Sequence, residues 1–110
     1  MDFKVREIVV LVDDNGKCPY REWRNNIRDT SLGAAIDARL ARVRNGNFGD
    51  HKSVGAGVYE LRIPKGSGLR IYYALEGDVI VVLLAGGDKK SQSKDIILAK
   101  KLWEDYQNET

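Results

Sequence analysis

This sequence of 110 residues contains one cysteine and one histidine, and each scarcity excludes a class of protein. A single cysteine, Cys18, cannot form an internal disulfide framework, which favours a reducing compartment such as the cytoplasm. A single histidine, His51, excludes a metal site built from several histidines, and we expect neither a metal ion nor a cofactor. No apolar run approaches the roughly 20 residues that cross a bilayer, so we expect no membrane partner.

The composition is that of a globular protein with an uneven distribution of charge. Hydrophobic residues make up 43% and charged residues 31%, and a chain of 12.4 kDa suits one domain over residues 1–110. The formal net charge is +2, but residues 31–75 carry seven basic and three acidic side chains. A polyanion would be sought in this basic middle part, although an inert solvated surface would look the same at this stage.

The apolar periodicity predicts four strands and three helices. The strands are expected at residues 3–12, 58–63, 69–75 and 79–85. The helices are expected at residues 19–29, from a cap at Thr30 or Ser31 to residue 44, and onward from Ser91 or Ser93. Residues 45–57 are rich in glycine and are expected to form a loop. Tight turns at 65–68 and 76–78 make residues 58–85 an antiparallel meander, and segregated helices define the class as α+β.

Basic side chains are expected to gather on one face of this meander. With the turn at 65–68 as a hinge, Arg62 and Arg70 become cross-strand neighbours, on the face opposite Leu61 and Ile71. The strand that ends at Lys89 runs back alongside Arg70. The other side chains expected around the same face are Tyr72, Lys90, His51 and Lys52.

This set of residues suits cleavage of RNA without a metal. Such cleavage uses the 2′-hydroxyl of the substrate as nucleophile and needs a base, an acid and positive charge near the phosphorane. Arginine binds phosphate oxygens with two parallel hydrogen bonds, and a lysine or histidine with a shifted pKa moves a proton. We expect Arg62, Tyr72 and Lys90 to contact RNA, with Tyr72 or Phe48 stacking on a base. The structural alternative is that Arg62 pairs with Glu60 or Glu76 and does nothing else.

Three segments of the chain resemble a known family. They are NGNFGDHKSVGAGVYELRI at residues 45–63, GLRIYYAL at 68–75 and VVLLAGGDKKSQSKDIILAK at 81–100. Together they closely resemble the bacterial addiction module killer proteins, which are HigB-type toxins of the RelE/ParE superfamily. The combination of an LRI strand, a G-x-R-x-Y-Y strand and a GGDK-xx-Q-xx-DI helix start is specific, and the resemblance extends over nearly the whole chain.

The resemblance implies a fold, an activity and a set of partners. The fold would be a small α+β domain of the microbial-RNase type, with the order β-α-α-β-β-β-α. The activity would be that of a type II toxin, an endoribonuclease that cuts messenger RNA in the ribosomal A site without a metal. The partners would be the ribosome and a co-encoded antitoxin, a helix-turn-helix protein of the HigA type. Operator DNA would be contacted only through the antitoxin complex.

The resemblance also implies roles for individual residues. Arg70 matches the arginine that binds the scissile phosphate, and Arg62 matches a recurrent basic position. Lys52 would be a base or phosphate ligand, Lys89 a catalytic basic residue, and His51 a group that transfers a proton.

The chain departs from the family pattern at one point. Several members have a catalytic tyrosine after the last strand, where this chain has the sequence Lys94-Asp95-Ile96, and Tyr106 lies too far along to replace it. The general acid and base are therefore unassigned, and Asp88 suits a turn as well as a chemical role. Two other functions stay open, a ParE-type poison of DNA gyrase and an inactive relative that only binds antitoxin.

Overall fold

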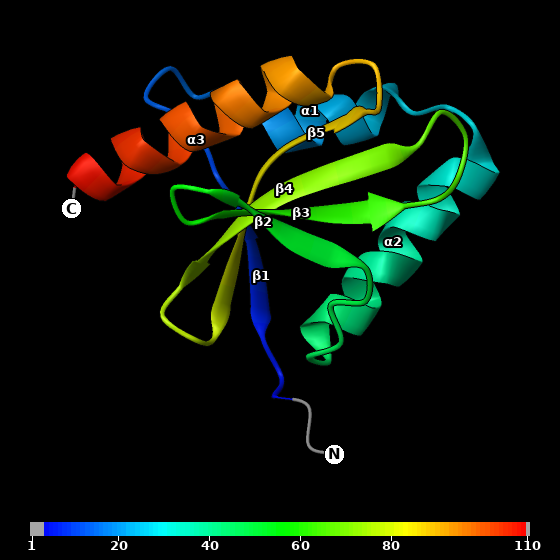
Figure 1. Ribbon diagram of the computed structural model, residues 1–110, viewed down its shortest axis with the longest axis horizontal. Coiled ribbons are helices and arrows are strands. Elements are labelled where there is room, and N and C mark those ends of the chain that lie inside the picture. Colours follow the sequence, from blue (N-terminus) through cyan, green and yellow to red (C-terminus); the bar gives the residue numbers. More distant parts are fainter. Residues whose placement is uncertain (1–3, 110) are drawn as a thin grey trace.

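The computed structural model describes residues 4–109, and Figure 1 shows its elements. Within that range, five strands and three helices form a mixed α+β structure, which confirms the predicted class. In chain order the elements are β1 (Glu7–Val10), α1 (Pro19–Asn26), α2 (Thr30–Arg44), β2 (His51–Gly55), β3 (Val58–Ile63), β4 (Leu69–Glu76), β5 (Ile80–Asp88) and α3 (Gln92–Asn108). None of these helices, over residues 4–109, is long and apolar enough to cross a membrane.

All five strands belong to one sheet with the order β1-β5-β4-β3-β2. β1 runs parallel to β5, whereas every other neighbouring pair is antiparallel. The predicted meander is confirmed, because β3, β4 and β5 follow one another in the sheet. β1 is shorter than the strand predicted at residues 3–12. Residue 3 of that prediction lies outside the described residues.

The segment predicted as a glycine-rich loop contains a strand, so the predicted number of strands was one too low. This strand, β2, pairs with β3 at the edge of the sheet. Glycine normally disfavours strands, which is why the sequence points to a loop. Here Gly55 and Gly57 build the turn between the two strands, with φ angles of +97° and +80°. These left-handed values cost glycine little, so the short hairpin forms.

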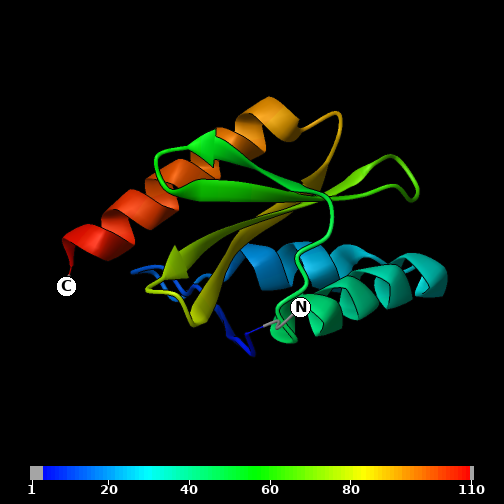
Figure 2. The same ribbon diagram turned by 60° about the horizontal axis from the view of Figure 1, so that its bottom comes forward.

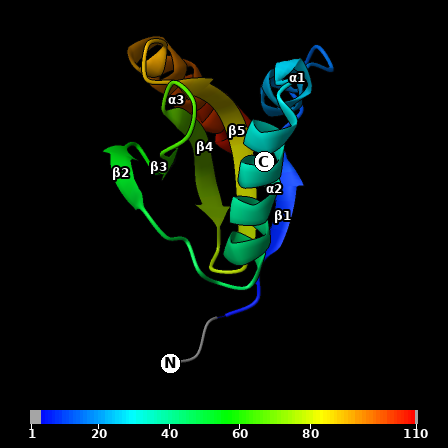
Figure 3. The ribbon, with the colours of Figure 1, turned by 90° about the vertical axis from the view of Figure 1, so that its right-hand side faces the viewer.

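Helices cover both faces of the sheet. Figure 2 shows α1 and α2 on one side and α3 on the other, and Figure 3 shows the same layers from the side. Side chains alternate along the strands, so Leu61 and Ile71 pack in the layer of α1 and α2, whereas Val58 and Ala74 pack in the layer of α3. β5 lies between β1 and β4 and is buried on both faces, as its continuous apolar run predicted.

The ends of the first two helices differ from the prediction. α1 ends at Asn26 rather than at residue 29. The cap of α2 is Asp29, and not Thr30 or Ser31, because the Asp29 carboxylate accepts hydrogen bonds from the backbone N–H groups of Ser31 and Leu32. α2 ends before Asn45, as predicted.

Arg39 of α2 is buried, with 5% of its surface exposed. Its guanidinium donates hydrogen bonds to the carbonyl oxygens of Phe48, Asp50 and Arg62, at 3.1, 2.6 and 2.7 Å. Burial lowers the pKa of Arg39, and the nearby charge of Arg42 adds to that effect. Arg39 therefore ties α2 to the loop before β2 and to the end of β3.

Candidate nucleic-acid interface

Basic side chains from neighbouring strands lie on the sheet face that α3 partly covers. The register pairs Arg62 with Arg70, Glu60 with Tyr72 and Lys52 with Glu60. Paired residues of antiparallel strands point to the same face, so these five side chains lie together. The structure thus brings Arg62 and Arg70 side by side, as the alternation of β3 and β4 predicted.

Lys89 comes close to Arg70 across the turn between β3 and β4. A Cβ atom placed on Gly68 would lie 3.4 Å from both the Arg70 Nη1 atom and the Lys89 Cβ atom. Gly68 has a φ of +83° and leaves the space through which these two residues meet. We call the group formed by Lys52, Arg62, Arg70 and Lys89 the cationic face.

Glu60 lies at the centre of the cationic face; the sequence indicated it only as an alternative partner of Arg62, and the structure contains that pair. The Glu60 side chain is 0% exposed. The Arg62 Nε atom lies 3.8 Å from Glu60 Oε1, and the Arg70 Nε atom lies 3.8 Å from Glu60 Oε2. Gln92, in the first turn of α3, donates a hydrogen bond of 2.7 Å to Glu60 Oε2. The available signal was an acidic residue two positions before Arg62, on the same face of a strand with sheet neighbours on both sides.

Asp88 organises the turn that presents Lys89. Its Oδ1 atom accepts hydrogen bonds from the backbone N–H groups of Lys90 and Ser91, at 2.9 and 3.1 Å. Its Oδ2 atom accepts one from the Ser67 hydroxyl at 3.1 Å. These bonds hold the pKa of Asp88 below its usual value, and the bond from the Ser91 N–H has the largest effect. The geometry supports a turn-forming role for Asp88. Lys90 is exposed, one residue beyond Lys89.

His51 does not join the cationic face, contrary to our expectation. It pairs in register with Leu61, so its side chain lies on the opposite face of β2 from Lys52. Its Nδ1 atom lies 2.9 Å from the Gly49 carbonyl oxygen, and its ring centre lies 5.5 Å from that of Phe48. The prediction treated residues 51 and 52 as parts of one loop, whereas a strand turns neighbouring side chains to opposite sides.

Tyr72 was expected to stack on an RNA base, but it presents no ring face to solvent. It lies in β4 beneath the start of α3 and is 0% exposed. Burial raises the pKa of Tyr72, and the negative charges of Glu60 and Asp95 raise it further. Phe48 is also engaged, since its ring stacks on Tyr73 at 5.4 Å and lies under the Arg6 guanidinium at 4.9 Å.

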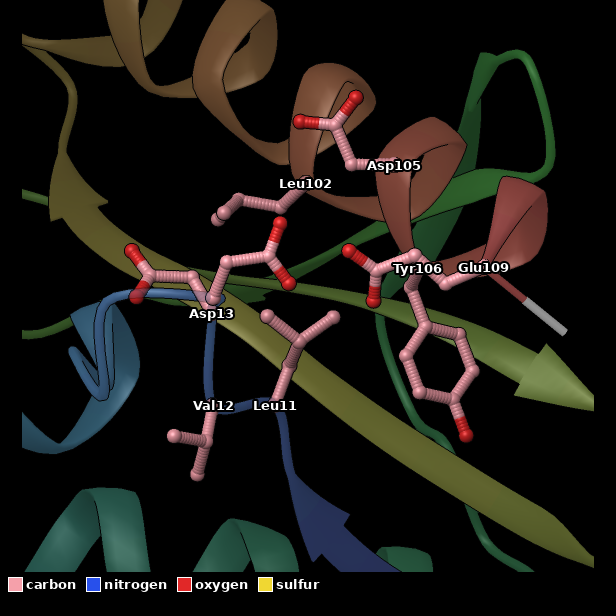
Figure 4. Close-up of a pocket in the computed structure, with 8 residues that line it drawn as sticks. Leu11, Val12, Asp13, Leu102, Asp105, Tyr106 and Glu109 are labelled. Carbon is pink, nitrogen blue, oxygen red and sulfur yellow. The ribbon is translucent and has the colours of Figure 1, made fainter.

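An acidic hollow lies away from the cationic face. Figure 4 shows this acidic hollow, which has a volume of about 40 Å³ between the segment after β1 and the last turns of α3. Its lining residues are Leu11, Val12, Asp13, Asp14, Leu102, Asp105, Tyr106 and Glu109. The hydrogen bond between the Glu109 and Asp14 side chains raises the pKa of Glu109. Several carboxyl groups at one place repel phosphate, so this hollow is no site for RNA.

Over residues 4–109, no three histidine, cysteine, aspartate or glutamate side chains come together in a way that would hold a metal ion. What the cationic face can do chemically follows from its donors. Two arginines of β3 and β4 lie side by side, with one lysine on the same face of β2 and another in the turn after β5, and such a group of cations suits binding of a phosphate group.

Residues 26–104 match the family described as "Phage derived protein Gp49-like (DUF891)". The matched range contains all four residues of the cationic face, together with Glu60 and Gln92. An uncharacterised protein from Haemophilus influenzae is 46% identical over 83 residues, which are 76% of this chain and 84% of that protein. The chain therefore belongs to the Gp49-like phage-derived family, a toxin-type family related to RelE and ParE.

Proposed function

We propose that this protein is the toxin of a type II toxin–antitoxin pair and an endoribonuclease of the HigB type, which cuts messenger RNA on the ribosome without a metal. The membership of a toxin-type family supports the general role. The observation that carries the enzymatic part is the convergence of Lys52, Arg62, Arg70 and Lys89 on one sheet face.

The reaction proposed for this face is an internal transfer within the RNA. The 2′-oxygen attacks the neighbouring phosphorus as its proton passes to a base, and the bond from phosphorus to the 5′-oxygen breaks as an acid protonates that oxygen. The products are a 2′,3′-cyclic phosphate and a 5′-hydroxyl. Arg62 and Arg70 would bind the nonbridging oxygens, where negative charge builds up in the transition state.

The proton carriers are chosen by position. Lys52 on β2 and Lys89 in the turn after β5 are the lysines nearest to the two arginines in the sheet register, and each would move a proton to or from a phosphate held by the arginines. His51 points to the other face of β2, and its proposed part in proton transfer would need the RNA to wrap around this edge strand. We therefore favour Lys52 and Lys89 as the acid–base pair.

The family also suggests an antitoxin partner. We propose that it is a co-encoded helix-turn-helix protein of the HigA type, and that operator DNA is bound only by the resulting complex. The ribosome and its messenger RNA would be the targets of the free toxin.

The test is to map new 5′ ends of transcripts after brief expression in cells. The wild type should generate ends inside translated regions, and Arg70→Ala should abolish them together with growth arrest. The matched control is Arg21→Ala, since Arg21 is an exposed arginine of α1 in the opposite helix layer. Ends that persist in Arg70→Ala would refute this site.

Two other results would refute the nuclease function itself. Growth arrest without new ends, combined with inhibited supercoiling by purified protein, would indicate a poison of DNA gyrase. A folded protein that causes neither arrest nor new ends would be an inactive relative that retains only antitoxin binding.

A further inference from the structure

We propose that Glu60 is a positioning residue of the cationic face: it holds Arg62 and Arg70 side by side in the arrangement that binds the scissile phosphate, and Gln92 of α3 holds Glu60. This inference rests on the proposed function, because it assigns Glu60 a part in the same phosphate site. Glu60 itself is 0% exposed, so it acts through the two arginines and does not touch RNA.

The need for such a residue follows from the register of the sheet. Arg62 and Arg70 face each other directly across β3 and β4, and like charges at directly opposed positions repel. Left alone, the two guanidinium groups would swing apart toward solvent. A carboxylate one pleat along β3 removes this repulsion when it attracts both at once, and Glu60 lies at that position.

The distances show that Glu60 serves both arginines in the same way. The Nε atom of each arginine lies 3.8 Å from a different oxygen of the carboxylate, which is within ion-pair range but beyond hydrogen-bonding distance. One Nη group of each arginine has another partner. The Arg62 Nη2 atom lies 3.4 Å from Asp50 Oδ1, and the Arg70 Nη1 atom lies 3.4 Å from the Leu69 carbonyl oxygen.

Burial makes this arrangement effective. The side chains of Arg70 and Arg62 are 13% and 36% exposed, and the Nε atom of each is buried. Charges interact more strongly where water is excluded, and a buried carboxylate without cations would be costly. The carboxylate and the arginines therefore hold one another in place.

Gln92 connects this trio to the helix that covers it. Its amide donates to Glu60 Oε2, the oxygen that faces Arg70, at 2.7 Å. Glu60 Oε1 has no hydrogen-bond partner at normal distance among residues 4–109, so the orientation of the carboxylate depends on the Gln92 amide at Oε2 and on the buried Tyr72 side chain beside it. The first turn of α3 thus sets the positions of two arginines that belong to two strands.

The first experiment measures kcat and KM for cleavage of messenger RNA on programmed ribosomes. Glu60→Gln keeps the size of the side chain and removes its charge. We expect kcat to fall about tenfold to a hundredfold, which is the scale of a misplaced catalytic group. KM should stay constant or fall, because the face gains one net positive charge. If kcat falls only in proportion to the fraction of protein that is folded, Glu60 has a merely structural role and the proposal is wrong.

A double-mutant cycle tests whether Glu60 acts through Arg70. Arg70→Lys keeps the charge but lacks the Nε group that pairs with Glu60. In the Arg70→Lys background, Glu60→Gln should lower kcat by less than it does in the wild-type background, because the contact with Arg70 is already lost while the contact with Arg62 remains. A full additional loss in that background would show that Glu60 acts independently of Arg70, contrary to the proposal.

A second measurement does not depend on cleavage. In NMR spectra of the purified chain, the Nε–H protons of Arg62 and Arg70 should exchange slowly with water, and faster in Glu60→Gln. The matched control is Asp37→Asn, because the Arg24 Nε–H donates to Asp37 at 3.1 Å on the opposite helix layer. That variant should affect Arg24 alone. Unchanged exchange at Arg62 and Arg70 in Glu60→Gln would overturn the positioning role.

The two readouts separate the two claims. If wild-type protein cuts no RNA but the exchange rates respond as expected, the nuclease function fails while Glu60 still positions the arginines. If Glu60→Gln does not fold, Gln92→Ala serves instead, since it removes only the hydrogen bond that orients Glu60. We then expect a smaller fall in kcat, about threefold to tenfold, and faster exchange of the Arg70 Nε–H. Wild-type values for both in a folded Gln92→Ala protein would contradict the proposal.

Discussion

Arg39 shows how one buried side chain can position several parts of a site. It donates to three carbonyl oxygens that belong to the loop before β2 and to the end of β3. The Asp50 carbonyl also accepts a hydrogen bond of 3.0 Å from the Arg62 backbone N–H, so Arg39 is a second donor there and supplies a donor to the carbonyls of Phe48 and Arg62. An arginine offers five N–H groups in a fixed fork, which lets one residue serve all three.

We expect Arg39→Met to lower the free energy of unfolding by about 3 kcal/mol, because a buried carbonyl without a donor costs about 1–3 kcal/mol. Urea denaturation of the purified protein measures this change. Arg42→Met, at an exposed position of the same helix, is the control and should stay within about 0.5 kcal/mol of the wild type. Similar losses in both variants would show that the carbonyl contacts of Arg39 matter little.

Asp88 gives a prediction for stability against pH. The pKa of Asp88 is lowered in the folded protein, and the hydrogen bond from the Ser91 N–H is the largest cause. The unfolded chain therefore binds the Asp88 proton more tightly than the folded chain does. The stabilisation is therefore present above the ordinary pKa of aspartate and is lost as the pH falls through the lower folded value. We expect Asp88→Asn to have a lower melting temperature than the wild type at pH 7. Between pH 5 and pH 3 the melting temperature of the variant should fall by less than that of the wild type. The control is Glu104→Gln, at an exposed position of α3, which should have the same pH dependence as the wild type. If the melting temperature of Asp88→Asn falls with pH as much as that of the wild type, Asp88 is not the source of this stabilisation.

At the scale of elements, the Gly86-Gly87 pair explains how two helices approach the same strand. A Cβ atom on Gly86 would lie 2.1 Å from the Trp23 ring of α1, and one on Gly87 would lie 1.8 Å from the Asp95 carboxylate of α3. The two glycines face opposite sides of β5. They let α1 and α3 pack closely against the end of the strand that leads into the Asp88 turn.

We expect Gly86→Ala and Gly87→Ala each to destabilise the fold by about 1–3 kcal/mol or more, since overpacked cores cost energy of this order. Gly87→Ala should also displace the first turn of α3, which carries Gln92, and should therefore reduce cleavage more than Gly86→Ala does. Thermal unfolding and the cleavage assay measure the two effects. Wild-type stability of both variants would show that the helices can move away at little cost.

The elements that the sequence predicted well are those set by local patterns. Turns of fixed length and alternating side chains determine the register of β3 and β4, so the pairing of Arg62 with Arg70 followed from the sequence alone. β2 could not be predicted in this way, because an edge strand forms through backbone pairing with β3 and its glycines hide it.

The missed residues of the site depend on contacts between distant elements. Glu60 looks like a surface partner for Arg62 until α3 is placed over it, and the separation of 32 positions between Glu60 and Gln92 hides their hydrogen bond. Tyr72 looks available for stacking for the same reason, although the start of α3 buries it. The alternation of side chains along a strand shows which face a residue lies on, but it does not show that a helix from another part of the chain covers that face.

At the scale of the whole molecule, α3 separates two regions of opposite charge. Its first turn borders the cationic face, and its last turns border the acidic hollow. A helix of 17 residues is about 25 Å long, which is about three times the screening length of physiological salt. The partial charges of the helix ends add to this polarity, since the N-terminus is positive and the C-terminus negative. The two regions therefore act independently on a charged ligand.

This separation predicts which lysines affect RNA binding. The logarithm of the affinity for a short single-stranded RNA should fall with the logarithm of the salt concentration, by about 0.7 for each phosphate contacted. Lys52→Ala and Lys89→Ala should each weaken binding and reduce that slope by about 0.7. Lys101→Ala, at the acidic end where Lys101 pairs with Asp105, is the matched control and should leave the slope unchanged. Fluorescence anisotropy between low and physiological salt measures the slopes. Equal slopes in all four proteins would mean that RNA binds elsewhere, because removal of a lysine that contacts a phosphate must reduce the number of released counterions.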